Sequence, residues 1–236
     1  FEDIRSRNTY ILRDYLKEIK ILRAGILPHK VVDNEMKKLQ KMRINDEISD
    51  VMILVEHPEI VTMGAKALRD KIIVDEDYET ANVDRGGGIT WHGPGQLVVY
   101  PIIKWDKGEQ NIRAIIGKIE ELVIGTLNDC GINGYRNKKM MGVWVDDRKI
   151  CSIGLAFLHW VSRHGLALNY STPGERIESL LCCGLEKNVT TSLDKLGYTH
   201  DQKGKLIDRD RLEKSLISNI ERVLERIPQK PLDWLP

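Results

Sequence analysis

Three segments of the chain carry apolar side chains at intervals of three and four residues, the spacing of an amphipathic helix. The first spans residues 8–27, the second begins at Ile112 and is terminated by Gly131, and the third begins near Asp208. A Lys-rich stretch, residues 31–42, is predicted to form a further, solvated helix. We therefore expect helices near both ends of the chain as well as within it.

Shorter apolar runs without helical spacing predict strands. Residues 51–55 form a continuous apolar run closed by His57-Pro58, as expected of a strand buried on both faces. Because strands and helices are intermixed and several strand connections have hairpin length, we expect an α/β (α+β) fold, a mixed β-sheet flanked by helices. Further strands are predicted at residues 72–74, 96–102, 143–145, 149–158 and 164–170, with a turn at Asp146-Asp147-Arg148.

The composition is that of an ordinary globular protein. Of the 236 residues, 42% are hydrophobic and 30% are charged, so a chain of this size can bury a core without disulfide or metal staples. No internal repeat or low-complexity linker divides the sequence. We therefore expect a single domain over residues 1–236.

Charge and cysteine content restrict the class of protein further. The chain has 36 Lys and Arg against 35 Asp and Glu, so no whole-molecule field favours nucleic acid or an anionic membrane. No apolar run approaches the roughly 18 residues of a membrane span, and residues 1–10 lack a secretion-signal pattern. The four cysteines show no CxxC spacing and no disulfide framework. We expect a cytoplasmic protein with reduced thiols that binds neither nucleic acid nor membrane.

A glycine-rich loop is the first candidate binding element. Residues 85–96, RGGGITWHGPGQ, let the backbone approach a ligand closely and direct N–H groups at anionic or carbonyl oxygens. Such loops often only reverse the chain, but the side chains of Arg85, Thr90, His92 and Gln96 among the glycines favour a binding role. The loop matches neither GxxxxGK[ST] nor GxGxxG, so it does not indicate nucleotide binding.

Two further tracts carry groups that are able to react. If residues 148–154 and 164–169 pair as antiparallel strands, Lys149, Cys151 and Ile153 share one face, and Ile150 and Ser152 share the other. Taken alone, a lysine at a strand start is more often a solvated edge residue.

The third tract, residues 180–185 (LLCCGL), places Cys183 directly before Gly184, at a turn where the sulfur is accessible. A reactive thiol also needs a lowered pKa, which a nearby ammonium group supplies. The alternative, which is the more common role of cysteine, is that Cys182 and Cys183 are both buried and unreactive. Zinc binding is less favoured, because adjacent cysteines ligate one ion poorly.

Together, these tracts resemble the octanoyltransferases of lipoate biosynthesis. The similarity covers about residues 50–195, and the segments at both ends lie outside it. The resemblance implies a fold shared with lipoate–protein and biotin–protein ligases. In chain order it includes Glu56-His57-Pro58, the 85–96 loop, Gly142-Val143-Trp144-Val145, Lys149 with Ser152-Ile153-Gly154, His164–Asn169, Cys183-Gly184 and Thr191-Ser192-Leu193.

The resemblance implies transfer of an octanoyl group from the thioester of acyl carrier protein to the N6-amine of a lysine on lipoyl domains or the glycine-cleavage H protein. It assigns Cys183 as the nucleophile that forms an acyl-thioester intermediate, and Lys149 as the group that lowers the thiol pKa and transfers protons. No cofactor, ATP included, is implied. The acyl substrate is expected to contact Arg85, Gly86, Gly87, Gly88, Ile89, Thr90, Trp91, His92, Ser152, Ile153, Gly154, Gly165, Leu166 and Ala167.

The physical chemistry agrees with this assignment. Exchange of one thioester for another is close to balanced, and attack by an amine then forms a more stable amide. Each tetrahedral intermediate bears an oxyanion that N–H groups beside Gly184 or within Gly86–Gly88 are expected to stabilise.

Two positions depart from the family pattern. Proline usually precedes the family's cysteine, whereas this chain has Cys182, so the residues leave two candidate nucleophiles and the position before Gly184 favours Cys183. The strand after the His-Pro turn often ends in Gly-Arg, whereas this chain reads Gly64-Ala65-Lys66, so a substrate contact there is not carried over.

Two other interpretations remain. An ATP-dependent lipoate or biotin ligase has the same architecture but needs no cysteine before a glycine, so Cys183 counts against it. A non-catalytic protein that binds acyl groups or lipoyl domains needs neither thiol nor lysine, so its binding would survive alkylation. A thioesterase is less favoured, because attack by water would waste the acyl-enzyme.

Overall fold

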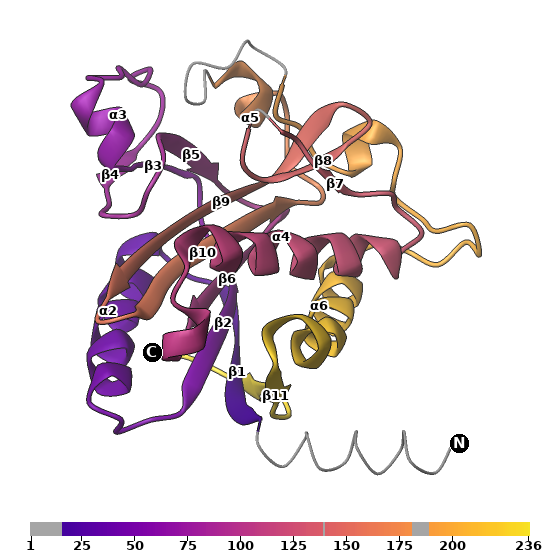
Figure 1. The fold of residues 1–236 in the computed structure, drawn as a ribbon. Coiled ribbons are helices and arrows are strands. Elements are labelled where there is room, and N and C mark those ends of the chain that lie inside the picture. The colour runs from indigo at the N-terminus through magenta and orange to yellow at the C-terminus, as the bar shows by residue number, and fades with distance from the viewer. Residues whose placement is uncertain (1–15, 139, 181–188) are drawn as a thin grey trace.

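The computed structural model describes residues 16–138, 140–180 and 189–236. Strands and helices alternate irregularly along these residues (Figure 1). In chain order they are β1 (Lys17–Ile26), α2 (His29–Ile44), β2 (Asp50–Glu56), β3 (Ile60–Met63), α3 (Ala65–Arg69), β4 (Thr80–Asn82), β5 (Ile89–His92), β6 (Gln96–Ile102), α4 (Ile112–Asn128), β7 (Tyr135–Arg136), β8 (Val143–Val145), β9 (Arg148–Leu158), β10 (Val161–Asn169), α5 (Arg176–Ser179), α6 (Arg209–Leu224), β11 (Arg226–Pro228) and β12 (Leu232–Asp233).

Most of the strands in the described residues belong to one large mixed sheet. Its order is β11-β1-β2-β6-β10-β9-β8-β7, and β12 also pairs with β1. Strand β1 runs parallel to β2, β11 and β12, whereas the pairings from β2 through β6, β10, β9 and β8 to β7 are antiparallel. The predicted mixed sheet flanked by helices is confirmed.

Helices cover both faces of the large sheet. Strand β2 shows this directly, because its side chains alternate between two cores: Met52 and Leu54 pack toward α4 and α6, and Val51, Ile53 and Val55 pack toward α2. Figure 1 shows α4 and α6 on the side of the sheet away from α2. Burial on both faces explains the continuous apolar run of β2. Among the described helices, none is long and apolar enough to cross a membrane.

A second, three-stranded sheet in the order β4-β3-β5 adjoins the large one. Its own small core is built from Val61 and Trp91 of the strands, Ala67 of α3, and Ile177 and Leu180 at α5. Strand β5 is formed by residues within the glycine-rich loop, so this small sheet fixes the position of the loop.

The predicted helices at 31–42, 112–127 and from Asp208 onward are confirmed as α2, α4 and α6. The predicted strands at 51–55, 96–102, 143–145, 149–158 and 164–170 are confirmed as β2, β6, β8, β9 and β10. At the start of α6, the Asp208 carboxylate accepts a hydrogen bond from the Arg211 N–H at 2.9 Å. This is the side-chain cap that an aspartate provides at a helix N-terminus.

The helix predicted over residues 8–27 is wrong for the part that the structure describes, because residues 17–26 form β1. Ile19 and Ile21 are both fully buried and alternate with exposed positions, which is the period of a strand. Pairing with β2 on one side and with β11 and β12 on the other overrides the helical spacing. Residues 8–15 of the prediction lie outside the described residues.

The strand predicted at residues 72–74 is also wrong. These residues pair with no strand among those described, and Ile73 is 93% exposed. Ile72 and Val74 instead pack against the core of the small sheet from a loop. The apolar run is therefore explained by the packing of two alternate side chains, and these residues form no strand.

The pairing of β10 with β6 depends on a glycine. A Cβ atom at Gly165 would lie 2.0 Å from the carbonyl oxygen of Val99 and 2.6 Å from Cδ of Pro101. Both atoms are held by the neighbouring strand, so no larger residue fits without separating the two strands. This close approach brings β10, with the His164–Asn169 motif, beside the strand that follows the glycine-rich loop.

Candidate active site

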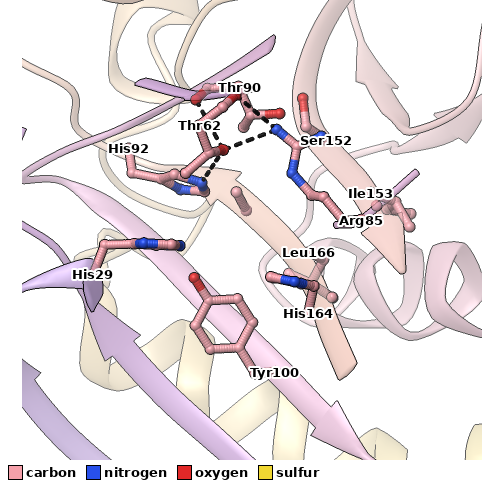
Figure 2. A pocket seen from close by; sticks show the side chains of 13 residues that line it. His29, Thr62, Arg85, Thr90, His92, Tyr100, Ser152, Ile153, His164 and Leu166 are labelled. Atoms are coloured by element: carbon pink, nitrogen blue, oxygen red, sulfur yellow. Dashed lines mark hydrogen bonds between the residues drawn. The ribbon is translucent and has the colours of Figure 1, made fainter. Parts of the chain in front are cut away.

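A cavity lies where the small sheet meets the large one (Figure 2). Its walls come from β3 and β5 of the small sheet, from β6, β9 and β10 of the large sheet, and from the first turn of α2. The lining residues are His29, Thr62, Arg85, Thr90, His92, Tyr100, Ser152, Ile153, Gly154, His164, Gly165, Leu166 and Ala167.

Parts of three segments that are far apart in the sequence meet in this cavity: residues 85–92, 152–154 and 164–167. The structure brings together most of the predicted substrate contacts: Arg85, Thr90, His92, Ser152, Ile153, Gly154, Gly165, Leu166 and Ala167. The remaining predicted contacts do not line the cavity. Ile89 and Trp91 point into the core of the small sheet, and Gly86, Gly87 and Gly88 form the backbone around Arg85.

The guanidinium group of Arg85 holds the glycine-rich loop in place. Nη1 donates to the carbonyl oxygens of Gly86 and Gly88, both at 3.0 Å. Nη2 donates to the carbonyl oxygen of Thr62 at 3.0 Å and to its Oγ1 at 2.8 Å, a bond drawn in Figure 2. A Cβ at Gly154 would lie 2.9 Å from Cδ of Arg85, so a glycine is needed where β9 passes this side chain.

Backbone N–H groups at the start of α3 bind the other side of the loop. Gly64 N–H donates to the Gly88 carbonyl at 3.0 Å, and Lys66 N–H donates to the Gly87 carbonyl at 3.0 Å. The tract that departs from the family pattern therefore supports the loop through its backbone. Gly86 N–H donates to the Leu155 carbonyl at 3.0 Å, so this predicted oxyanion donor is already engaged.

A chain of buried hydrogen bonds links the motifs behind the cavity. His92 Nδ1 lies 2.8 Å from Gln96 Oε1, Gln96 Nε2 donates to Asn169 Oδ1 at 2.8 Å, and Asn169 Nδ2 donates to the Thr191 carbonyl at 3.0 Å. An amide oxygen only accepts, so His92 carries its proton on Nδ1, and its Nε2 accepts from Thr62 Oγ1 at 3.2 Å. The chain fixes the tautomer of a cavity-lining imidazole.

Burial keeps the imidazoles around the cavity neutral. It lowers the pKa of His29 and of His57 to about 4, and that of fully buried His92 well below its usual value. Burial also lowers the pKa of His164, against the opposing hydrogen bond with Asp84 at 2.9 Å. Among the described residues, no three His, Cys, Asp or Glu side chains are arranged to hold a metal ion.

Lys149 lies at the start of β9, at the far end of the strand from the hairpin with β10, and its side chain is half-buried. Two backbone hydrogen bonds fix it to the segment that follows residues 181–188: Lys149 N–H donates to the Val189 carbonyl, and Thr191 N–H donates to the Lys149 carbonyl, both at 2.9 Å. A Cβ at Gly142 would lie 2.7 Å from Lys149 Cε and 3.4 Å from Nζ. The lysine side chain therefore packs directly on the Gly142 backbone.

A β-bulge changes the faces that were expected for β9. Val143 is opposite Cys151 and Trp144 is opposite Lys149, so β9 has one extra residue, Ile150, between the two pairs. Ile150 and Cys151 both belong to the core beneath α4, so the prediction that they lie on opposite faces is wrong.

The predicted nucleophile Cys183 and its alternative Cys182 lie outside the described residues, as does Gly184. The described cysteines, Cys130 and Cys151, are buried free thiols. Burial raises the pKa of both, to about 12 for Cys151, which disfavours their reactive thiolate forms.

A buried carboxylate connects the described residues that lie before and after residues 181–188. Glu178 of α5 accepts from Thr191 Oγ1 at 3.1 Å and from Lys195 Nζ at 2.8 Å, and is only 7% exposed. Arg176, two residues earlier, donates twice to Glu59 at 2.7 Å. The chain before residue 181 and the chain after residue 188 are thereby fixed to each other and, through Thr191, to Lys149.

Sequence reasoning missed part of the cavity wall. His29 comes from the first turn of α2, Thr62 from β3 and Tyr100 from β6, and none of them lies in the tracts chosen for their chemistry. His164 begins the His164–Asn169 motif but is not among the expected substrate contacts, yet it lines the cavity. A sequence signal existed for Tyr100 alone, as a polar aromatic side chain inside a strongly apolar strand.

The histidine pKa values predict acid sensitivity of the fold. Because the folded-state pKa of His29 and of His57 is about 4 and lies below the unfolded value, stability is complete above pH ~6.5 and falls as the pH drops toward 4. Each histidine contributes about 1.4 kcal/mol per pH unit in that window. Urea unfolding at several pH values gives the slope of the unfolding free energy against pH. In His29→Gln this slope should be smaller by the contribution of one histidine. The exposed control His200→Gln should keep the full slope, and an unchanged slope in His29→Gln would contradict the assignment.

Comparison with known proteins agrees with this architecture. The profile of the lipoyl protein ligase A/B catalytic domain matches residues 35–217. The octanoyltransferase of Syntrophobacter fumaroxidans is 36% identical over 225 residues, which cover 93% of each chain. Among solved structures, lipoate-protein ligase A bound with ATP has a TM-score of 0.68 at 13% identity, covering 92% of this chain and 89% of that one.

A bipartite lipoate protein ligase from Thermoplasma acidophilum, solved as part of a lipoylation system with its E2 lipoyl domain, has a TM-score of 0.61 at 15% identity. The match covers 92% of this chain and 88% of the ligase chain. At these identities the structures establish a shared fold, and the expected ligase-like architecture is confirmed. The chain therefore belongs to the lipoyl protein ligase A/B catalytic domain family, and it is an acyltransferase enzyme whose relatives are octanoyltransferases.

Proposed function

We propose that this enzyme transfers an octanoyl group from the thioester of acyl carrier protein to the N6-amine of a lysine on a lipoyl domain or the glycine-cleavage H protein. The acyl group is carried between them as a thioester on Cys183, and Lys149 transfers the protons. Octanoyl transfer is the activity named for the Syntrophobacter fumaroxidans relative, and a lipoyl domain is the partner named for the Thermoplasma acidophilum ligase.

The observation that carries this proposal is the attachment of Lys149 to the chain on both sides of residues 181–188. Its N–H and carbonyl groups bond to Val189 and Thr191, and Thr191 is bonded to Glu178 ahead of that tract. A lysine joined by backbone bonds to the segment bordering a Cys-Gly sequence is suited to act on that thiol. The described thiols of Cys130 and Cys151 are buried and have raised pKa values, which supports assigning the nucleophile within residues 181–188.

In the first half-reaction, the Cys183 thiolate attacks the carbonyl carbon of the donor thioester. The tetrahedral intermediate collapses with cleavage of the carbon–sulfur bond to the carrier, and the Lys149 ammonium donates its proton to the departing carrier thiolate. The products are an acyl-Cys183 thioester, a neutral Lys149 amine and a free carrier thiol. No ATP is consumed.

In the second half-reaction, the neutral amine of the acceptor lysine attacks the acyl-Cys183 carbonyl. Lys149 accepts the proton released by the attacking nitrogen, the Cys183 thiolate leaves, and an amide is formed. The enzyme returns to its starting thiolate and ammonium. The Gly86 N–H is already bonded to the Leu155 carbonyl. The proposed oxyanion donors are therefore the N–H groups of Gly87 and Gly88 and those beside Gly184.

The cavity between the two sheets is the proposed acyl site. Ile153, Leu166 and Ala167 contribute apolar surface to its wall, and Gly154 and Gly165 leave the backbone close to the ligand. An octanoyl chain has about seven carbon atoms beyond its carbonyl carbon, and burying them at about 0.8 kcal/mol each supplies several kcal/mol of binding. Neighbouring chain lengths differ by only one or two such groups, so we expect coarse selection by length.

Intact-mass spectrometry after incubation with octanoyl-acyl carrier protein, without ATP, tests the nucleophile. The wild-type protein and Cys182→Ser should gain one octanoyl group each, Cys183→Ser should gain none, and Lys149→Ala should form the adduct more slowly. Cys151→Ser serves as a control for loss of a buried thiol. An adduct on Cys183→Ser, full activity of Lys149→Ala, or a strict need for ATP would overturn the proposal.

A matched pair of leucine substitutions tests the acyl site. Leu166→Ala enlarges the cavity. It should raise the ratio of kcat/KM for longer acyl donors to kcat/KM for octanoyl by roughly tenfold. Leu168→Ala removes the same atoms from the same strand but from a buried position that does not line the cavity. It should leave the ratio unchanged while costing similar stability, roughly 2–5 kcal/mol. Equal ratios in the two variants would place the acyl chain elsewhere.

A further inference from the structure

A buried carboxylate on α4 faces the part of the sheet that holds Lys149. Glu120 is only 9% exposed. Its Oε1 accepts from the Gly142 N–H at 3.1 Å, and its Oε2 accepts from Arg136 Nε at 3.2 Å. Figure 1 shows α4 running past β7 and β8. Arg136 belongs to β7, and Gly142 directly precedes β8. The mechanism described above gives Glu120 no role.

The Gly142 backbone connects Glu120 to the end of the Lys149 side chain. Gly142 has φ of +120°, which a residue with a side chain adopts only with strain. A Cβ there would also lie 2.3 Å from the Cys151 carbonyl and 2.7 Å from Lys149 Cε. The glycine is therefore in contact with the lysine on one side and hydrogen-bonded to the carboxylate on the other.

The charges of Glu120 and Lys149 act on one common neighbour. Burial is the main cause of the raised pKa of Cys151, the Lys149 charge opposes the rise, and the Glu120 charge adds to it. Both groups therefore lie within Coulombic range of a single buried sulfur beneath β9. Charged groups on neighbouring elements are Arg148 on the same strand and Arg136 on β7, and Glu178 bonds to Thr191, whose N–H bonds to Lys149.

We propose that Glu120 is a positioning residue for Lys149: it fixes the Gly142 backbone against the lysine side chain and stabilises the ammonium form with its negative charge. This inference rests on the proposed function, in which Lys149 must be an ammonium when the carrier thiolate leaves. Arg136, whose side chain is 46% exposed, shares the carboxylate and offsets part of its field. Glu120 and Arg136 therefore shift the charge state of Lys149 in opposite directions.

Opposite shifts distinguish this role from simple support of the fold. Glu120→Gln keeps an amide oxygen for the Gly142 N–H but removes the negative charge, so the Lys149 pKa should fall by about one unit. Arg136→Gln removes a cation and leaves the carboxylate unshared, so the Lys149 pKa should rise. The basic limb of the pH–rate profile for octanoyl transfer should move in the same direction in each variant, with KM for the donor little changed.

The direct measurement is an NMR titration of the full-length protein carrying lysine labelled with ¹³C at Cε. Lys149→Arg assigns the Lys149 resonance, and thermal unfolding checks that each variant is folded. A fall in Glu120→Gln and a rise in Arg136→Gln support the inference. The same Lys149 pKa in folded Glu120→Gln and wild type, or shifts of the same sign in both variants, overturn it.

This titration requires no turnover, so it separates the two claims. If Lys149→Ala keeps full transferase activity, the proposed function fails whatever the titration shows. If Lys149→Ala is impaired but the titration shows no shift in Glu120→Gln, the proposed function stands and the role of Glu120 is refuted.

Discussion

The buried guanidinium of Arg85 is the contact on which the geometry of the cavity depends. A charged side chain that is only 7% exposed is tolerated because backbone carbonyls and a hydroxyl bind it from several directions. These bonds fix the glycine-rich loop to β3, and the contact with Gly154 sets the loop against β9. Arg85 and its loop therefore contact both sheets, and the cavity beside them is the proposed acyl site. The rest of the wall consists of neutral imidazoles and apolar side chains. This wall suits a thioester, because a thioester carries no charge and needs no counter-ion.

A second set of contacts connects this cavity to Lys149. The hydrogen-bond chain from His92 through Gln96 and Asn169 ends at Thr191, whose N–H bonds to the Lys149 carbonyl. Each link is buried, so each is costly to leave unpaired and the spacing between the motifs is strongly determined. Glu120 acts on Lys149 separately from this chain, through its hydrogen bond with the Gly142 backbone that packs on the lysine side chain. The proposed chemistry thus depends on two rigid supports, one that shapes the acyl site and one that sets the state of the lysine.

Much of the fold followed from apolar periodicity, and the failures have physical causes. α4 and α6 were predictable because they bury side chains at the helical period, and β2 and β6 because each is a short continuous apolar run that is buried at every position. β1 was not, because its spacing also fits a helix and only pairing with β2, β11 and β12 decides between the two. In the cavity, glycines and polar residues within motifs were identifiable, whereas His29, Thr62 and Tyr100 reach it from elements whose neighbours are set only by tertiary structure. The bulge at Ile150 likewise depends on strand register, which the sequence does not display.

The central claim is that an acyl-Cys183 thioester, served by Lys149, lies on the route from donor to acceptor. Its most direct test is a single-turnover measurement: octanoyl-enzyme, freed of donor, is mixed with an unmodified lipoyl domain in the absence of ATP. Our account predicts transfer of the octanoyl group to the domain's lysine at a rate at least equal to steady-state turnover, and slower transfer from octanoyl-Lys149→Ala. An isolated octanoyl-enzyme that fails to transfer, or transfers more slowly than the enzyme turns over, would contradict it.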